Sequence, residues 1–101
     1  MQATTLPRIF NAVKAAYPKA IALFRNGDFY EAFEHDAVIL NEQFKLPLVT
    51  EGVVSKVGFP HFGLDQYLPK IVRAGFKVAL VDEIDEHNGK GVSFNLSTAE
   101  Q

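Results

Sequence analysis

The sequence of 101 residues contains no cysteine, and this absence removes two classes of small protein from consideration. Neither a disulfide framework nor a thiolate zinc site can form, which fits an intracellular protein. No apolar run approaches the roughly 20 residues of a membrane-spanning helix, and the N-terminus lacks the basic and then apolar pattern of a secretory signal. We therefore expect a cytoplasmic protein with no membrane partner.

The chain also lacks an excess of basic residues, with 10 lysines and arginines against 12 aspartates and glutamates and a net charge of −2. A domain that binds nucleic acid by itself normally carries a basic patch. If this chain binds DNA, we expect further domains or subunits of a larger protein to supply much of the phosphate neutralisation.

Motifs for cofactors are missing as well. Gly89-Lys90-Gly91 lacks the Gly-x4-Gly-Lys-Ser/Thr spacing of a phosphate-binding loop, and there is no nucleophile elbow. We therefore expect no cofactor, no metal and no catalytic residue. With 48% hydrophobic and 22% charged residues the composition is that of a globular protein. We expect one domain over residues 1–101 with a frayed tail at 97–101.

Apolar periodicity and breaker residues predict three helices and several strands. The helices are expected at residues 5–17, from His35 to Phe44 with Asp36 as the N-cap, and at about 64–74. Pro69 removes a backbone donor inside the third helix, so we expect a late start or a kink there. Two short strands are expected within 48–62, a loop at 58–63, a central strand at 76–81 and an edge strand at 92–96. This order predicts an α/β domain, in which about three helices pack on a small mixed sheet.

The stretch from Ala20 to Phe33 consists of two apolar runs on either side of Asn26-Gly27. Asn-Gly between strand-like segments favours a type I′ hairpin turn, in which both central residues have positive φ. A two-residue loop fixes the register, so we expect Arg25 to face Asp28 and Phe24 to face Phe29. One face of the hairpin then carries a set of core-packing residues: Ile21, Leu23, Tyr30 and Ala32.

The other face of this hairpin carries Phe24, Phe29 and Phe33, with Glu31 among them. A carboxylate beside aromatic side chains is unusual on a buried face, so we interpret this face as a working surface. The residues alone leave two alternatives open. In place of a working surface, Phe29 could be a core aromatic paired with Phe24, and Glu31 could be a solvated strand residue.

The stretch Gly27-Asp28-Phe29-Tyr30-Glu31 resembles the hallmark Gly-Asp-Phe-Tyr-Glu of the N-terminal mismatch-recognition domain of the MutS DNA mismatch-repair family. Further similarities follow in order and extend the resemblance from about Tyr17 to Leu96. They are Asp36-Ala37, Gly58-Phe59-Pro60, Tyr67-Leu68 with Lys70, and Gly75-Phe76-Lys77-Val78-Ala79. The resemblance implies a small mixed sheet with surrounding helices, the class that the periodicity also predicts.

The resemblance also implies a function, the binding of double-stranded DNA that contains a mismatch or a bulge. In this family the hallmark Phe wedges from the minor groove against a mispaired base and the Glu hydrogen-bonds to that base. Those positions are Phe29 and Glu31 here. Inserting an apolar side chain unstacks and kinks the duplex, and a mismatch lowers that cost. Candidate contacts to phosphates are Arg25, Lys56 and Lys70. The ATP-binding ATPase of full-length relatives would lie in domains absent from this chain, so we expect no enzymatic activity.

The chain departs from the family pattern in two places. Thr50-Glu51 stands where the family tends to place a basic residue, and Ser55-Lys56-Val57 replaces the usual Pro-Met-Ala. An acidic residue at position 51 would turn a phosphate contact into repulsion.

Two other functions follow from the residues. Glu31, Glu34, His35 and Asp36 form a local polar cluster and His61 lies in an expected loop, so a metal site or proton transfer is one alternative. The other is a protein-protein interaction module, with Phe29 as an exposed anchor on a neutral-to-acidic surface. The salt dependence of DNA affinity distinguishes this module from a DNA reader.

Overall fold

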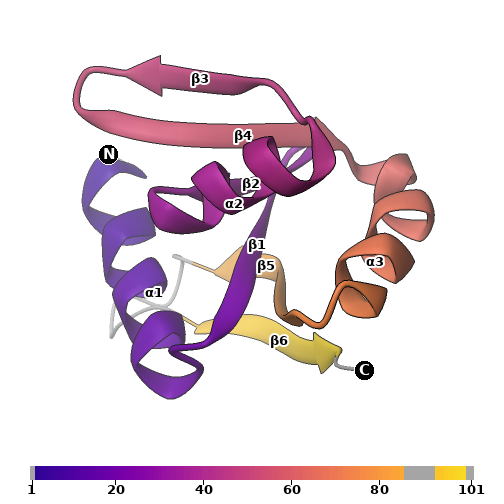
Figure 1. The fold of residues 1–101 in the computed structure, drawn as a ribbon. Coiled ribbons are helices and arrows are strands. Elements are labelled where there is room, and N and C mark those ends of the chain that lie inside the picture. Colours follow the sequence, from indigo (N-terminus) through magenta and orange to yellow (C-terminus); the bar gives the residue numbers. More distant parts are fainter. Residues whose placement is uncertain (1, 86–92, 100–101) are drawn as a thin grey trace.

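The structure is a computed structural model that describes residues 2–85 and 93–99 (Figure 1). Within these residues the chain forms three α-helices, one short 3-10 helix and six strands. In chain order they are α1 Gln2–Ala16, β1 Ala20–Asn26, β2 Phe29–Phe33, α2 His35–Phe44, β3 Leu48–Glu51, β4 Val54–Pro60, η1 His61–Gly63, α3 Leu64–Arg73, β5 Lys77–Asp85 and β6 Ser93–Ala99.

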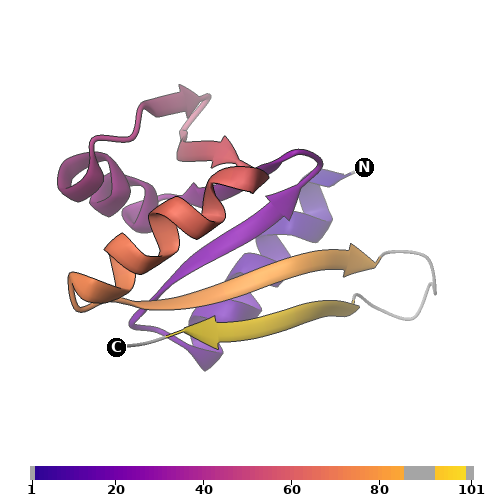
Figure 2. The same ribbon diagram turned by 90° about the vertical axis from the view of Figure 1, so that its right-hand side faces the viewer.

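The strands of the described residues form one mixed sheet in the order β3-β4-β2-β1-β5-β6. Strands β1 and β5 are parallel, and the other neighbouring pairs are antiparallel. Helix α1 covers one face of the sheet, while α2 and α3 lie on the other (Figures 1 and 2). The predicted class, an α/β domain with helices packed on a small mixed sheet, is confirmed.

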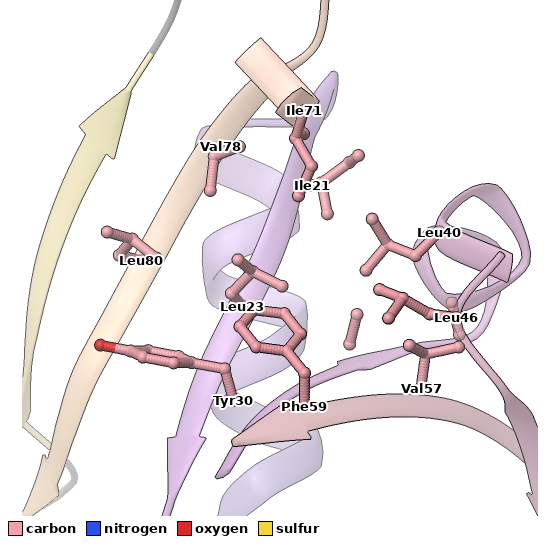
Figure 3. Packing of buried hydrophobic residues seen from close by; sticks show 12 residues of the cluster. Ile21, Leu23, Tyr30, Leu40, Leu46, Val57, Phe59, Ile71, Val78 and Leu80 are labelled. Carbon is pink, nitrogen blue, oxygen red and sulfur yellow. The ribbon is translucent and has the colours of Figure 1, made fainter. Parts of the chain in front are cut away.

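The larger core lies between the sheet and helices α2 and α3 (Figure 3). Leu40 enters it from α2 and Ile71 from α3, and both are fully buried. Alternate residues of the central strands point into this core, because side chains of a strand alternate between the two faces. The set predicted for the core face of the hairpin is buried here, as expected: Ile21, Leu23, Tyr30 and Ala32.

A second core lies on the opposite face, under α1. Ile9 and Val13 of the helix are buried against strands β1 and β5. Residues 78–81 of β5 alternate between the two cores and are all buried, which confirms the predicted central strand. The sheet is therefore covered on both faces at its centre, the arrangement for which continuous apolar strands are typical.

The register of the β1–β2 hairpin differs from the prediction by two residues. Asn26 pairs with Phe29, Arg25 with Tyr30 and Phe24 with Glu31, so the turn is Gly27-Asp28 rather than Asn26-Gly27. The expected pairings of Arg25 with Asp28 and of Phe24 with Phe29 are wrong. A slip of two residues leaves every side chain on its original face, which is why the predicted core set is nevertheless right.

Asp36 closes the gap where β1 and β2 separate. Its carboxylate accepts a hydrogen bond from the Ala22 N–H at 3.1 Å, and the Lys14 ammonium donates to its two oxygens at 3.1 and 3.0 Å. Lys14 also donates to the carbonyl oxygen of Ala20 at 2.5 Å, so the ion pair serves two backbone groups of β1. The N-cap of α2 is Glu34, and its side chain makes no capping bond. The prediction of Asp36 as N-cap is therefore wrong, because its carboxylate is turned toward β1.

Several element boundaries also differ from the sequence predictions. Helix α1 begins at Gln2, and α3 begins at Leu64 and continues past Pro69, so the expected late start is wrong. The expected loop at 58–63 is wrong in its first half, because residues 58–60 belong to β4 and pair with β2. Strand β6 is Ser93–Ala99, so it ends three residues beyond the predicted edge strand at 92–96. Residues 86–92, 100 and 101 lie outside the described part of the chain.

Candidate nucleic-acid interface

The tip of the β1–β2 hairpin has a defined turn conformation and is held by two hydrogen bonds. Gly27 adopts φ of +62°, a conformation that glycine reaches without steric cost. The Arg25 Nε donates to the Gly27 carbonyl at 2.6 Å, and the His61 backbone N–H donates to the Asp28 carbonyl at 2.7 Å. The tip is thus tied both to its own strand and to the end of β4, which places the first residue of β2 on a defined support.

That first residue is Phe29, whose exposed fraction is 48%. Its strand neighbours are Asn26 on one side and Pro60 on the other. The alternative in which Phe29 is a core aromatic paired with Phe24 is wrong, since Phe29 neither opposes Phe24 nor is buried. An exposed phenylalanine on a braced hairpin is able to enter an apolar environment supplied by a partner molecule.

The two other phenylalanines on this face are structural. Phe24 is 1% exposed, and its ring packs against Phe33 at 5.8 Å and against Phe10 of α1 at 6.0 Å between centroids. The prediction that the whole face is a working surface is therefore wrong for Phe24 and Phe33, which belong to the core under α1. Only the tip end of this face carries an exposed aromatic side chain in the hairpin.

Glu31 follows Phe29 by two residues and lies on the same face. Its side chain is only 12% exposed, and both carboxylate oxygens have partners. The Asn26 side-chain amide donates to Oε1 at 3.1 Å, and the Lys56 ammonium lies 3.4 Å from Oε2. The alternative of a solvated strand residue is wrong, because Glu31 is held in a small polar network at the rim of the second core.

Gly58 of β4 lies directly opposite Glu31 of β2 and places no side chain beside the carboxylate. A Cβ placed there would lie 3.5 Å from the Glu31 Cγ, an ordinary van der Waals contact. The glycine is exposed, so the approach to Glu31 from this side is open. The carboxylate thus has Asn26 of β1 on one side and Lys56 of β4 on the other, and the β4 residue directly opposite it has no side chain.

The three candidate phosphate contacts are divided between the two faces of the sheet. Lys56 opposes Phe33 and lies on the face of Phe29 and Glu31. Arg25 lies on the other face, with its guanidinium carbon 5.8 Å from the centre of the Tyr30 ring. Lys70 lies on α3, which also covers that other face, with its ammonium 5.7 Å from the Tyr67 ring centre. The structure therefore places Phe29, Glu31 and Lys56 on one face, with Glu31 and Lys56 in contact, and places Arg25 and Lys70 on the other. The side chain of Glu51 lies outside the described part.

Tyr30, between the two predicted site residues, points the opposite way into the larger core (Figure 3). Its hydroxyl donates to Asp82 Oδ1 at 2.6 Å. Burial raises the pKa of Tyr30 above its ordinary value, and the hydrogen bond to Asp82 raises it further. The hallmark stretch thus alternates between residues that present the tip and a residue that fixes the hairpin to the core.

The polar cluster considered for catalysis is only partly brought together by the fold, because Glu31 lies apart and pairs with Lys56. Asp36 is buried in its ion pair with Lys14, while Glu34 and His35 are exposed at the start of α2. These residues line a surface hollow of about 540 Å³ beneath α1. Within the described residues, no three histidine, aspartate or glutamate side chains are grouped as they would be around a metal ion.

Sequence reasoning missed the partners of Glu31 and one exposed aromatic. The predicted register puts Asn26 in the turn, whereas in the structure Asn26 belongs to β1 and its side-chain amide donates to Glu31. Lys56 sits two residues from the position opposite Glu31, a diagonal that long side chains can span. Phe62 in η1 is 80% exposed, although its apolar character alone suggested no such position. Among the described residues, no helix has the length and apolarity needed to cross a bilayer.

Comparison with known proteins identifies the family. The profile described as MutS domain I matches residues 4–99. The chain belongs to the MutS domain I family. It is 43% identical over 88 residues to the DNA mismatch repair protein MutS of Porphyromonas gingivalis, an alignment covering 82% of this chain and 10% of that protein. It is 40% identical over 97 residues to MutS of Salinibacter ruber, covering 88% of this chain and 11% of that protein.

The MutS domain I match includes Phe29, Glu31 and Lys56, the three predicted residues that share one face of the sheet. MutS of Cytophaga hutchinsonii is similar to the same degree, 42% identical over 82 residues. The chain spans about a tenth of the length of these relatives. The suspected relationship to MutS is thereby confirmed at the level of this one domain.

Proposed function

We propose that this chain binds double-stranded DNA at a mismatched or bulged base and serves DNA mismatch repair as a non-catalytic module. Phe29 is the wedge, and Glu31 accepts a hydrogen bond from the displaced or mispaired base. Membership of MutS domain I supports the class of function. The relatives named above are mismatch repair proteins, and this chain corresponds to a tenth of their length.

The observation that carries the proposal is the contrast among the phenylalanines of one hairpin face. Phe24 is buried under α1, whereas Phe29 on the same face is half exposed at a tip held by hydrogen bonds. Unstacking a base step costs a few kcal/mol, which a wedge recovers by contacts with the kinked duplex. To unstack a base step, the backbone that carries Phe29 must keep its position. The hydrogen bond from the His61 N–H to the Asp28 carbonyl helps to hold it there.

The test is a titration of the 101-residue chain against fluorescent DNA at low salt. The probes are a homoduplex, the same duplex with a G·T mismatch, and the same duplex with a single-base bulge. Phe29→Ala is expected to abolish the preference for the defective duplexes. Affinity for these duplexes should fall by about 10-fold or more, because base–aromatic contact contributes about 1–3 kcal/mol. Its unfolding free energy is expected to change by less than about 1 kcal/mol, since the side chain is half exposed.

Tyr17→Ala is the matched control, because Tyr17 is also a partly exposed aromatic but lies before β1, at the end of the strand away from the tip. It is expected to retain the preference. A Phe29→Ala variant that keeps its mismatch preference, or that loses stability like a core variant, contradicts the wedge.

A second function is favoured by a different observation. Strand β3 is an edge of the sheet, and Leu48, Val49 and the turn residue Val53 are exposed there. An exposed apolar edge strand is suited to pairing with another protein. If the chain shows no DNA binding at high micromolar concentration, a protein-protein interaction module on the MutS domain I fold becomes the better proposal.

A further inference from the structure

We infer that Lys56 determines the specificity of the site by positioning Glu31 and cancelling its charge. This inference rests on the proposed function, because it assigns Lys56 a role in the discrimination made by Phe29 and Glu31. Lys56 acts through Glu31 and is a positioning residue rather than a direct reader of the base.

The geometry supplies a two-point hold on one carboxylate. Lys56 approaches Oε2 at 3.4 Å from β4, and Asn26 donates to Oε1 at 3.1 Å from β1. The two partners come from the strands on either side of β2, so the carboxylate cannot rotate without breaking one contact. A free glutamate side chain loses rotamer entropy when a ligand fixes it, whereas the Glu31 side chain is already fixed in the folded chain.

The held carboxylate keeps capacity for a base. An ionised carboxylate offers about four acceptor positions, of which Asn26 and Lys56 use two. Gly58, the residue of β4 directly opposite Glu31, contributes no side chain next to the carboxylate, and this glycine is exposed. A base N–H entering beside Phe29 therefore finds an acceptor whose direction is already set.

Charge gives Lys56 its second effect. A lone carboxylate beside the minor groove repels the phosphates on both strands, and screening over a Debye length of about 10 Å does not remove this at short range. Lys56 makes the local charge neutral. The reader can then approach the duplex without the repulsion that an isolated glutamate would bring in a chain whose net charge is already −2.

The experiment compares affinities for homoduplex and for G·T or bulged duplex among the wild-type chain, Lys56→Met, Lys56→Arg, Glu31→Gln and the double variant Lys56→Met/Glu31→Gln. Methionine keeps the length of lysine and removes the charge. Lys56→Met is expected to lower the ratio of the two affinities about 3- to 10-fold, the worth of one well-placed hydrogen bond. Lys56→Arg keeps the positive charge and is expected to keep the wild-type ratio. In the Glu31→Gln background, Lys56→Met is expected to change the ratio by less than about 2-fold, because the two residues act as one unit.

Lys70→Met is the matched control, since it removes the same charge from α3 on the other face of the sheet. It is expected to lower both affinities together and to leave their ratio unchanged. Circular dichroism and thermal melting establish that each variant is folded. Lys56→Gln repeats the charge removal if the methionine variant does not fold.

The outcomes separate this inference from the proposed function. If wild type shows a mismatch preference that Phe29→Ala abolishes and Lys56→Met retains, the role of Lys56 is overturned and the wedge stands. If Lys56→Met lowers the ratio equally with and without Glu31, Lys56 contacts the DNA directly and does not act by positioning. If wild type itself shows no mismatch preference, the proposed function fails and the role of Lys56 fails with it.

Discussion

Neighbouring side chains of the hallmark point to opposite faces of the sheet, because side chains alternate along a strand. Phe29 and Glu31 point to the face where α1 stops covering the sheet, while Tyr30 points into the larger core. The exposed Phe29 is therefore followed by a tyrosine that is buried in the core. Mutating either kind of residue tests a different property, binding for Phe29 and Glu31 and stability for Tyr30.

Tyr30 gives a prediction about the pH dependence of stability. Its pKa is raised by burial and then by Asp82, so the folded chain keeps the hydroxyl proton to higher pH than the unfolded chain does. Above about pH 10, where an unfolded tyrosine ionises, the unfolded state gains stability and the folded state does not. The free energy of unfolding is therefore expected to fall as pH rises past 10, with this contribution intact below that value.

Denaturant titrations between pH 8 and 11 check this expectation. Tyr30→Phe removes the titrating group and is expected to show a shallower fall over pH 10 to 11, together with a lower free energy at pH 8 from loss of the bond to Asp82. Tyr17→Phe, a change at a more exposed tyrosine, is expected to follow wild type. Equal slopes for Tyr30→Phe and wild type would contradict the assignment.

At the scale of elements, the hairpin and the helices are joined by one ion pair. Lys14 of α1 and Asp36 of α2 come from helices on opposite faces of the sheet and meet at β1. Lys14 donates to the Ala20 carbonyl and Asp36 accepts from the Ala22 N–H, in the part of β1 that precedes its pairing with β2. Asp36 is only 4% exposed, so its charge depends on Lys14 and on the Ala22 N–H for compensation.

Asp36→Ala is expected to lower the free energy of unfolding by about 3 kcal/mol, because it leaves the Ala22 N–H and the Lys14 ammonium without their partner. Chemical denaturation at neutral pH measures the change. Asp65→Ala is the matched control, because Asp65 is also in the first turn of a helix but is exposed, and it is expected to cost less than about 0.5 kcal/mol. A loss for Asp36→Ala no larger than that for Asp65→Ala would mean that the ion pair is dispensable.

At the scale of the whole molecule, charge limits how strongly this chain alone can bind DNA. The net charge is −2, and the three candidate phosphate contacts are spread over both faces of the sheet. Each phosphate contact contributes about −0.9 to the slope of log affinity against log salt. Affinity in larger MutS proteins, of which this chain spans a tenth, is then expected to draw on other parts of the protein.

The expected slope for the isolated chain is no steeper than about −3, corresponding to at most three phosphate contacts. Titrations with G·T duplex at a series of salt concentrations from about 25 to 200 mM measure it. The Lys70→Met slope is expected to be shallower than that of wild type by about 0.9, the contribution of one phosphate contact. A slope near −6 would require a basic surface beyond Arg25, Lys56 and Lys70.

The sequence by itself determined the elements, the fold class and the family. A continuous apolar run predicts the central strand, the 3.6-residue period predicts the helices, and the hallmark at residues 27–31 indicates the MutS family. These features are local, because a strand or a motif is written in consecutive residues. Even the face assignment of the hairpin survived a wrong register, since a slip of two residues preserves it.

Only the tertiary structure decided which side chains of that face are free and what holds them. Phe24 and Phe29 have the same chemistry, but α1 covers Phe24 and leaves Phe29 exposed. Asp36 leaves its expected cap for Lys14, and Glu31 meets Lys56 across 25 positions of sequence. Such contacts join segments that are distant along the chain, so they depend on packing and register, which local sequence preferences do not encode.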